Sequence, residues 1–190
     1  MKTLHRARRR AAGFTLIETL IVLLIFGILV ILVLPNFLKA IQHQKLLGVT
    51  QQTAILMRLA RLQAIKTAVS TVVQIDTAKG TVTAFSDPNN NQTLDSGETM
   101  LGQIGIDQSK AKGVTLMAVS GFTSPPTPAV AIFRSDGSTA AVGAFRFQNA
   151  SGDQIEARVM AATSGRIVLQ KYNGSTWLPN GEGANAWKWK

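Results

Sequence analysis

Residues 13–38 read GFTLIETLIVLLIFGILVILVLPNFL, and this stretch decides how the chain is organised. No charged side chain occurs from Thr19 to Leu38. The run is long enough to cross a bilayer, because a membrane helix takes about 20 apolar residues. Glu18 stands at the edge of the run, where an ionised carboxylate costs about 2.5–3.5 kcal/mol on insertion scales. Glu18 is therefore a candidate functional residue that needs a partner.

Basic residues precede the apolar run. The segment MKTLHRARRRAAG, residues 1–13, holds five Lys and Arg and no acid. Such a positive flank keeps the N-terminus in the cytoplasm, so the rest of the chain is expected on the other side of the membrane. A secretory signal would have a shorter apolar region with small residues after it. Here Ala11, Ala12 and Gly13 come before the run, so cleavage beside them would leave the membrane helix on the mature chain.

The residues from Gly13 to Glu18, GFTLIE, behind a short basic leader resemble the N-terminal signal of type IV pilins and pseudopilins. The resemblance implies that a prepilin peptidase cuts between Gly13 and Phe14 and that Phe14 is then N-methylated. It also implies a partner for Glu18, which is the positive N-terminal amine of a neighbouring subunit in a filament. The alternative is a plain signal anchor in which Glu18 lies at the membrane interface.

The helical pattern continues beyond Pro35. Four apolar residues recur at spacings of three and four, which predicts a face for a core: Ile55, Leu59, Leu62 and Ile65. Three basic residues are expected on the opposite face: Arg58, Arg61 and Lys66. No acid occurs between Glu18 and Asp76. Either these cations are simply solvated, or they contact acidic subunits or, near Lys39, lipid headgroups.

After Val69 the pattern changes to short, β-branched, partly alternating segments that predict antiparallel strands in a meander. Turn signals separate them at Lys79-Gly80, Asp136-Gly137, Ser151-Gly152 and Ser164-Gly165. The proline-rich segment 121–130 is expected to be an exposed loop. The predicted fold is α+β, with a long N-terminal helix packed on an antiparallel sheet. Its parts are a basic leader (1–13), a transmembrane helix (14–38), an amphipathic continuation (39–69) and a periplasmic β-rich domain (70–190).

The later strands carry a narrower resemblance. The segments AIFRSDGST, AFRFQN and IEARVMAATSGRIVLQKY are similar to the soluble domain of GspH/FimT-like minor pilins, with Asp136-Gly137 and Gly165-Arg166 at the matching turns. The resemblance implies a minor pilin or pseudopilin in the tip or shaft of a type IV pilus or a type II secretion pseudopilus. Its partners would be other pilin subunits, the prepilin peptidase and the inner membrane. The alternative is a DNA-binding minor pilin that serves DNA uptake.

Composition excludes several classes of function. The 190-residue chain has no cysteine, so it forms no disulfide and performs no thiol chemistry. Its net charge of +10 falls to +5 without the leader, which leaves 15 basic against 10 acidic side chains. That balance does not by itself indicate nucleic-acid binding. No His/Asp/Ser set and no phosphate-binding glycine loop stands out, so we do not expect an enzyme. We expect no bound cofactor, and the alternative is a bound calcium ion.

The loop DPNNNQTLDSGE, residues 87–98, has oxygen-bearing side chains at the ligand positions of an EF-hand calcium loop. The candidate ligands are Asp87, Asn89, Asn91, Thr93, Asp95 and Glu98. Gln92 stands where that loop has the glycine of its sharp turn, and no second helix follows. Two interpretations stay open, a calcium site and a purely structural turn built from Asx turns.

Aromatic and basic residues interleave near the C-terminus, where Trp177, Trp187 and Trp189 occur with lysines. This composition suits stacking on single-stranded DNA and contact with its phosphates. The candidate DNA-binding residues are Arg166, Lys171, Lys188 and Lys190. The alternative is that the tryptophans contact neighbouring pilin subunits.

Overall fold

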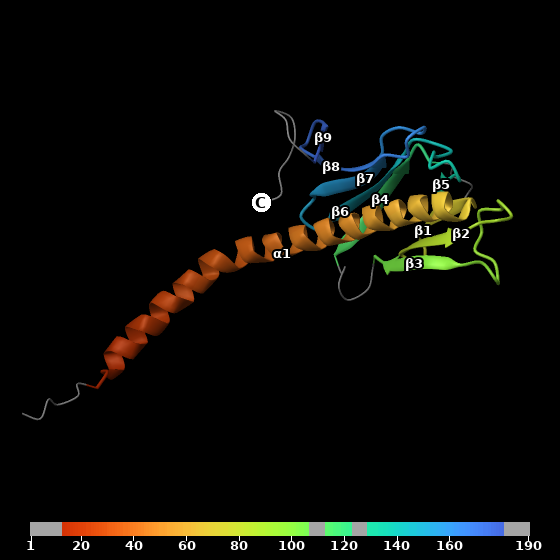
Figure 1. The fold of residues 1–190 in the computed structure, drawn as a ribbon. Coiled ribbons are helices and arrows are strands. Elements are labelled where there is room, and N and C mark those ends of the chain that lie inside the picture. The colour runs from red at the N-terminus through yellow and green to blue at the C-terminus, as the bar shows by residue number, and fades with distance from the viewer. Residues whose placement is uncertain (1–12, 107–112, 123–128, 181–190) are drawn as a thin grey trace, which may run out of the picture. The chain divides into compact units, whose positions relative to one another are not determined.

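The structure is a computed structural model that describes residues 13–106, 113–122 and 129–180. The chain divides into two compact units, one up to Lys39 and one from Ala40 onward. Among these described residues, one long helix contributes to both units and nine strands belong to the second (Figure 1). Each unit is described below by itself.

The helix α1 spans Leu16–Thr67, 52 residues, with Pro35 inside it. The helix predicted over 14–69 is therefore confirmed to within two residues at each end. Thr15 caps its start, because the Thr15 hydroxyl accepts a hydrogen bond from the backbone N–H of Glu18 at 3.3 Å. Ala68 follows the helix in the left-handed conformation, with φ of 55°, which is a common way for a helix to end.

In the first unit, every large apolar side chain of α1 from Leu16 to Leu38 is exposed. This part is Leu, Ile, Val and Phe on all sides, so no single face could be buried against a sheet. Within the described residues it is also the one helix long and apolar enough to cross a membrane.

In the second unit, α1 buries one face, and the predicted core stripe is wrong. Ile55, Leu59 and Leu62 are 59%, 43% and 61% exposed, and Ile65 is exposed as well. The buried face instead consists of Leu46, Val49, Thr50, Thr53, Ala54, Leu56, Met57, Ala60 and Ala64.

Five of the nine residues on the buried face are small or carry a hydroxyl group, and the other four are Leu46, Val49, Leu56 and Met57. Thr50 and Thr53 donate their hydroxyls to the carbonyls of Leu46 and Val49 at 2.8 and 2.9 Å, so neither carries an unpaired polar group into the core. Alanines let the sheets approach the helix closely. The prediction followed the spacing of Ile55, Leu59, Leu62 and Ile65, and these four residues lie on the exposed side of the helix.

The strands form two antiparallel sheets. Sheet A has the order β3 (Met100–Gly105), β2 (Thr81–Ser86), β1 (Thr71–Asp76) and β5 (Ala129–Phe133). Sheet B has the order β4 (Val114–Ser120), β6 (Ala144–Asn149), β7 (Gln154–Val159), β8 (Ile167–Tyr172) and β9 (Trp177–Pro179). The predicted α+β fold, a long helix with antiparallel strands, is confirmed.

A single meander was predicted, and the structure corrects this. Strands β1 to β3 and β6 to β9 do follow one another, but β5 returns to pair with β1 and β4 pairs with β6. Turn residues fix local hairpins, whereas the partners of β4 and β5 are set by which strands bury their apolar faces together. The strand β9 was not predicted.

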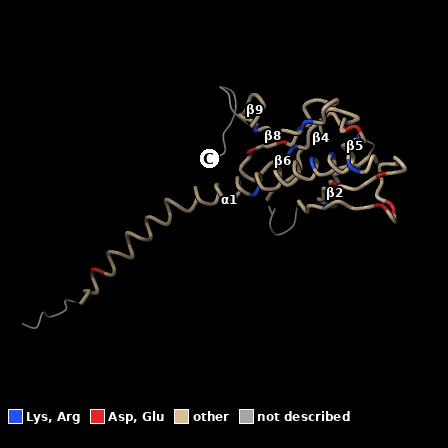
Figure 2. Tube along the Cα trace, viewed as in Figure 1, with Lys and Arg blue, Asp and Glu red and all other residues tan. Residues whose placement is uncertain are grey.

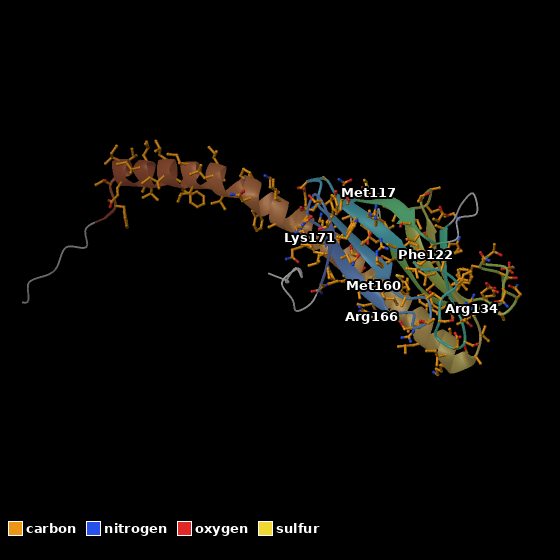
Figure 3. All side chains as sticks on the ribbon, turned by 90° about the horizontal axis from the view of Figure 1, so that it is seen from above. Met117, Phe122, Arg134, Met160, Arg166 and Lys171 are labelled. Carbon is orange, nitrogen blue, oxygen red and sulfur yellow. The ribbon has the colours of Figure 1, made fainter. Side chains whose placement is uncertain are left out.

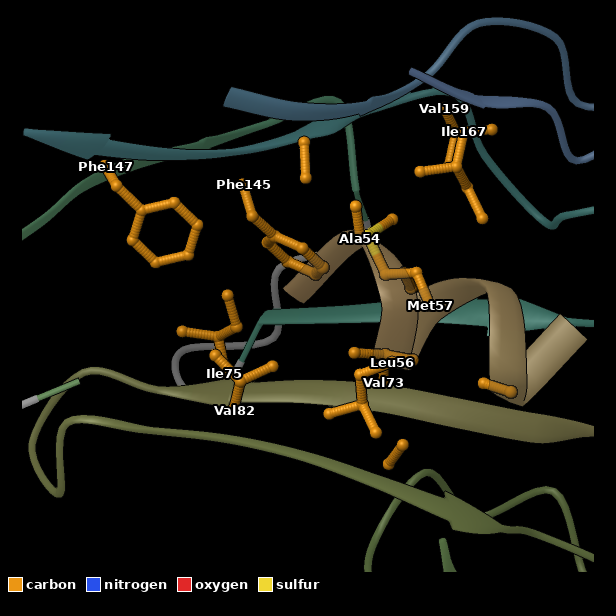
Figure 4. Close-up of a cluster of buried hydrophobic side chains, with 14 of the residues drawn as sticks. Ala54, Leu56, Met57, Val73, Ile75, Val82, Phe145, Phe147, Val159 and Ile167 are labelled. Atoms are coloured by element: carbon orange, nitrogen blue, oxygen red, sulfur yellow. The ribbon is translucent and has the colours of Figure 1, made fainter. Parts of the chain in front are cut away.

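The helix and both sheets share one hydrophobic core (Figure 4). Leu56 and Met57 of α1 contribute to it, together with side chains of sheet A such as Val73 and of sheet B such as Phe145. Phe122 also packs here, with its ring centroid 4.7 Å from that of Phe145. Phe122 belongs to the predicted proline-rich loop and is buried, while residues 123–128 of that loop lie outside the described residues.

Two of the predicted turns meet over the helix. Arg61 of α1 donates its Nε to the carbonyl of Gly137 at 2.9 Å. A Cβ on Gly165, whose φ is 55°, would approach the same carbonyl oxygen to 2.4 Å. Both turns therefore need glycine, and Arg61 joins them to the helix rather than lying on a solvated face.

Candidate functional site

The N-terminal segment holds the residues predicted for processing and assembly. Gly13 and Phe14 are exposed and precede the helix, and Glu18 lies in its first turn. A chain segment outside regular structure is what a peptidase needs in order to bind an extended backbone. The basic leader, residues 1–12, lies outside the described residues.

Glu18 occupies the third position of α1, counted from the Thr15 cap. The sequence Thr15-Leu16-Ile17-Glu18 matches a capping box, and the helix dipole favours a negative charge here. The helix dipole therefore gives the Glu18 carboxylate a local role at the start of the helix that sequence reasoning did not consider, although Glu18 does not make the return hydrogen bond of a capping box. The Glu18 side chain is exposed, and in the described part of the chain its carboxylate has no hydrogen-bond or ion-pair partner. Figure 2 shows a single acidic position in the first half of α1.

The loop between β2 and β3 gathers the predicted calcium ligands, and internal hydrogen bonds occupy many of their oxygens. Asp87 is buried, and its two carboxylate oxygens accept the backbone N–H groups of Asn91 and Gln92 at 3.1 and 3.0 Å. Asp95 accepts the side-chain amides of Asn89 and Asn91 at 3.0 and 2.6 Å. These contacts are those of a turn stabilised by Asx interactions.

The rest of this loop gives mixed support for a cation. Gln92 adopts φ of 63°, the left-handed conformation that a calcium loop gives to glycine. Glu98 Oε1 is buried and accepts no hydrogen bond, whereas Oε2 accepts the Asp95 backbone N–H at 3.0 Å. Across the described ranges, no three His, Cys, Asp or Glu side chains are arranged to hold a metal ion. Calcium binding stays a prediction.

The candidate DNA-binding residues are not brought together. Arg166 directly precedes β8 and is exposed, while Lys171 lies near the other end of that strand and is half-buried (Figure 3). Five residues of extended chain separate them, about 17 Å. Lys188 and Lys190 lie outside the described residues.

A charged cluster on sheet B was missed by sequence reasoning. Glu156 of β7 is fully buried, and its carboxylate accepts hydrogen bonds from Arg146 at 3.0 and 3.1 Å and from Arg158 at 2.6 Å. The Arg146 guanidinium also lies 4.4 Å from the ring centroid of Trp177. Trp177 in turn packs against Tyr172, with centroids 5.2 Å apart. This tryptophan is therefore used within the domain.

The sequence did contain a signal for this cluster. A hairpin whose turn is centred on Ser151 pairs Arg146 directly with Glu156, as the structure shows. Opposite charges facing each other on neighbouring strands are favourable cross-strand pairs. The turn at Ser151-Gly152 was recognised, but the register that it imposes was not used.

Two exposed aspartates belong to turns. The backbone N–H of Lys79, followed by its ammonium group, lowers the pKa of Asp76 below its ordinary value. Hydrogen bonds from the side chain and backbone of Ser138 lower the pKa of Asp136 in the same direction. Both carboxylates stabilise tight turns, and neither lies beside a candidate catalytic group.

Comparisons with known proteins give two matches that agree with this geometry. Residues 49–165 match the family model of the type II transport protein GspH, which covers more than half of the chain. Residues 8–34 match the prokaryotic N-terminal methylation motif, which includes the predicted cleavage site and most of the apolar run. No curated protein and no solved structure matches the chain.

The two matched regions lie in one chain in the order that a processed filament subunit requires. The methylation motif covers the start of α1, and the GspH match runs from the domain half of α1 to the turn before β8. Such subunits are structural, are processed by a prepilin peptidase and assemble with other pilins. The chain therefore belongs to the GspH family of type II transport proteins, as a minor pseudopilin of the type IV pilin superfamily.

Proposed function

We propose that this chain is a membrane-inserted precursor that is cut between Gly13 and Phe14 and then joins the tip or shaft of a secretion pseudopilus or type IV pilus. Residues 1–13 are the leader, 14–38 the membrane segment, 39–69 its helical continuation and 70–190 the periplasmic domain. The basic leader supports the orientation, because positive residues stay on the cytoplasmic side.

One observation carries the proposal, which is the exposure of the first half of α1. All its large apolar side chains, from Leu16 to Leu38, lack contacts that would remove them from solvent. Such a segment is stable in a bilayer or in a bundle of similar helices. A filament subunit uses both environments in turn, first the membrane and then the filament.

Glu18 is proposed as the contact that sets the position of one subunit against the next. Its carboxylate is exposed, and cleavage would give each mature chain a positive amine at Phe14. A buried ion pair has its best-attested use in specifying register, since desolvation offsets much of the Coulomb attraction. The capping role of Glu18 within its own helix is the competing explanation, and it needs no second subunit.

A DNA-binding minor pilin is the second candidate. The exposed Arg166 at the start of β8 favours it, because a guanidinium there can reach a phosphate. Binding through phosphates would weaken steeply as salt rises. If purified filaments carrying Arg166→Ala bind single-stranded DNA as well as the parent filaments do at several salt concentrations, this candidate is wrong.

Processing is the direct test of the main proposal. Gly13→Arg should abolish cleavage, because the peptidase needs a small residue beside the cut, and the full-length precursor should remain in the membrane. Ala11→Arg is the matched control, since it adds the same side chain to the leader and leaves the cleavage site unchanged. Intact-mass measurement should show a mature chain that begins with methylated Phe14 in the control. An uncut natural chain, or a different N-terminus, would contradict the proposal.

A further inference from the structure

The turn between β8 and β9 contains an asparagine followed directly by a glycine, Asn173 and Gly174. Both residues are exposed, and a Cβ added to Gly174 would meet no atom within 4 Å. The turn is tight, because the backbone N–H of Asn173 donates to the carbonyl of Thr176 at 3.1 Å. Neither residue takes part in the processing, assembly or ion-binding sites considered above.

Hydrogen bonds fix the Asn173 side chain in this turn and polarise its carbonyl group. Asn173 Oδ1 accepts the backbone N–H groups of Ser175 and Thr176 at 3.0 and 2.8 Å. Two such donors stabilise the negative charge that develops on the oxygen when its carbon is attacked. The nitrogen of Gly174 is the neighbouring nucleophile, and its N–H forms no hydrogen bond within the described residues.

Asn149, in the turn between β6 and β7, makes the same kind of contacts and serves as a comparison. Asn149 Oδ1 accepts the backbone N–H groups of Ser151 and Asp153 at 3.0 and 2.9 Å. Asn149 differs because it is only 5% exposed and its amide nitrogen donates to Asp153 Oδ2 at 3.0 Å. In the described part of the chain the amide nitrogen of Asn173 has no such partner, so it is free to leave.

We propose that Asn173 is a site of spontaneous covalent modification, because its turn exposes the side chain and leaves both the amide nitrogen and the Gly174 N–H unpaired. The Gly174 nitrogen forms a bond to Cγ of Asn173 while the Cγ–Nδ2 bond breaks. The amide nitrogen takes the Gly174 proton and leaves as ammonia. Water then opens the cyclic imide at either carbonyl, giving its hydroxyl to the carbon and its proton to the nitrogen. The products are aspartate and isoaspartate.

The two products should affect the turn differently. Aspartate keeps an oxygen that can accept the N–H groups of Ser175 and Thr176, so it preserves the turn. Isoaspartate adds a carbon atom to the main chain, which displaces the Asn173 N–H from the Thr176 carbonyl. Trp177 begins the short strand β9 directly after this turn, so isoaspartate should loosen β9 and the contact of Trp177 with Arg146.

The test is to incubate the purified, folded full-length chain in detergent at mildly alkaline pH and to map the products by mass spectrometry. In heavy-oxygen water each new conversion carries a labelled oxygen, which separates it from conversion in the cell. Asn173 should convert about tenfold faster than Asn149, a difference of about 1.4 kcal/mol in the activation barrier. Equal rates at the two residues, or no conversion of Asn173, would overturn the inference.

Two variants separate the effect of the turn from that of the following glycine. Gly174→Ala should slow the conversion of Asn173 about tenfold, because a Cβ obstructs ring closure. Asn180, which also precedes a glycine, should keep its parent rate. Ala150→Gly places a glycine after Asn149, which should still convert about tenfold more slowly than Asn173. Conversion of Asn149 in that variant as fast as Asn173 would overturn the inference, as would an unchanged Asn173 rate in Gly174→Ala.

Discussion

The first half of α1 is richer in apolar residues than the second half, and the two halves have opposite surroundings. From Leu16 to Leu38 all the large apolar side chains are exposed, whereas from Leu46 to Ala64 one face is buried beneath two sheets. The first half is completed only by something outside the chain, a membrane or other helices. The second half is completed by its own domain and leaves a narrower exposed stripe. Apolar residues in this helix therefore serve two different functions, and within the second half it is burial rather than hydrophobicity that separates the core residues from the exposed ones.

The largest effect is expected when one residue is truncated in each half of α1 and the stability of the domain is compared. Met57→Ala should destabilise the domain by about 2–5 kcal/mol, because Met57 is fully buried and its loss leaves a cavity. Leu24→Ala, in the exposed first half, should leave the thermal unfolding of the domain unchanged. Near-UV circular dichroism of the detergent-solubilised full-length chain would measure both.

Leu59→Ala is the control within the domain half. Leu59 lies two residues from Met57 on the exposed side of the helix, and its truncation removes a similar side-chain volume. The midpoint temperature of thermal unfolding should therefore stay close to that of the parent chain. Equal destabilisation by Met57→Ala and Leu59→Ala would show that the two faces of this half are not distinct.

A calcium ion bound by the loop 87–98 would also stabilise the domain. If the loop 87–98 binds calcium when folded, a hundredfold excess over the Kd should add about 2.7 kcal/mol to the free energy of unfolding. Thermal unfolding in millimolar calcium, magnesium and EDTA would show it, and Asp95→Ala should remove the difference. The same curve in calcium and EDTA would establish that the loop is only a turn, consistent with the hydrogen bonds that Asp87 and Asp95 already accept.

A smaller effect should separate the two roles of Glu18 in the first half of α1. Glu18→Gln keeps the size of the side chain and removes its charge, while Glu18→Ala removes both. If an intersubunit ion pair matters, both variants should insert into the membrane normally and both should enter sheared filaments about tenfold less, which takes only about 1.4 kcal/mol. Normal incorporation of both would leave helix capping as the only role of Glu18.

The smallest effect concerns the turn that joins the domain to the helix through Arg61. Because hydrogen bonds from Ser138 lower the pKa of Asp136 in the folded state, its contribution to stability is present above the unfolded pKa of about 3.9 and is lost as pH falls through the folded value. Asp136→Asn should therefore make the midpoint slightly less dependent on pH below about 4. The midpoint temperature of thermal unfolding is measured between neutral and acidic pH for the parent chain and for Asp136→Asn. The same pH dependence in the two proteins would contradict this role.

Much of the difference between the two halves of α1 could be predicted from particular residues in the sequence. The run from Thr19 to Leu38 has no charged side chain and is long enough to cross a bilayer, and the structure leaves its large apolar side chains exposed. Gly13 to Glu18 identified a processing signal that the methylation-motif match covers. The four predicted turns have glycines with φ between 55° and 88°, a conformation that glycine adopts at the lowest steric cost.

The amino-acid sequence by itself determined the long helix, its uncharged first half, the strands β1 to β8 and the family, because each depends on local composition or on a contiguous motif. Only the tertiary structure decided which face of the domain helix is buried and how β4 and β5 pair. Those outcomes depend on residues distant in sequence. Alanine, threonine and methionine pack at Ala60, Thr53 and Met57 because two sheets reach them there, and no periodicity within the helix contains that information.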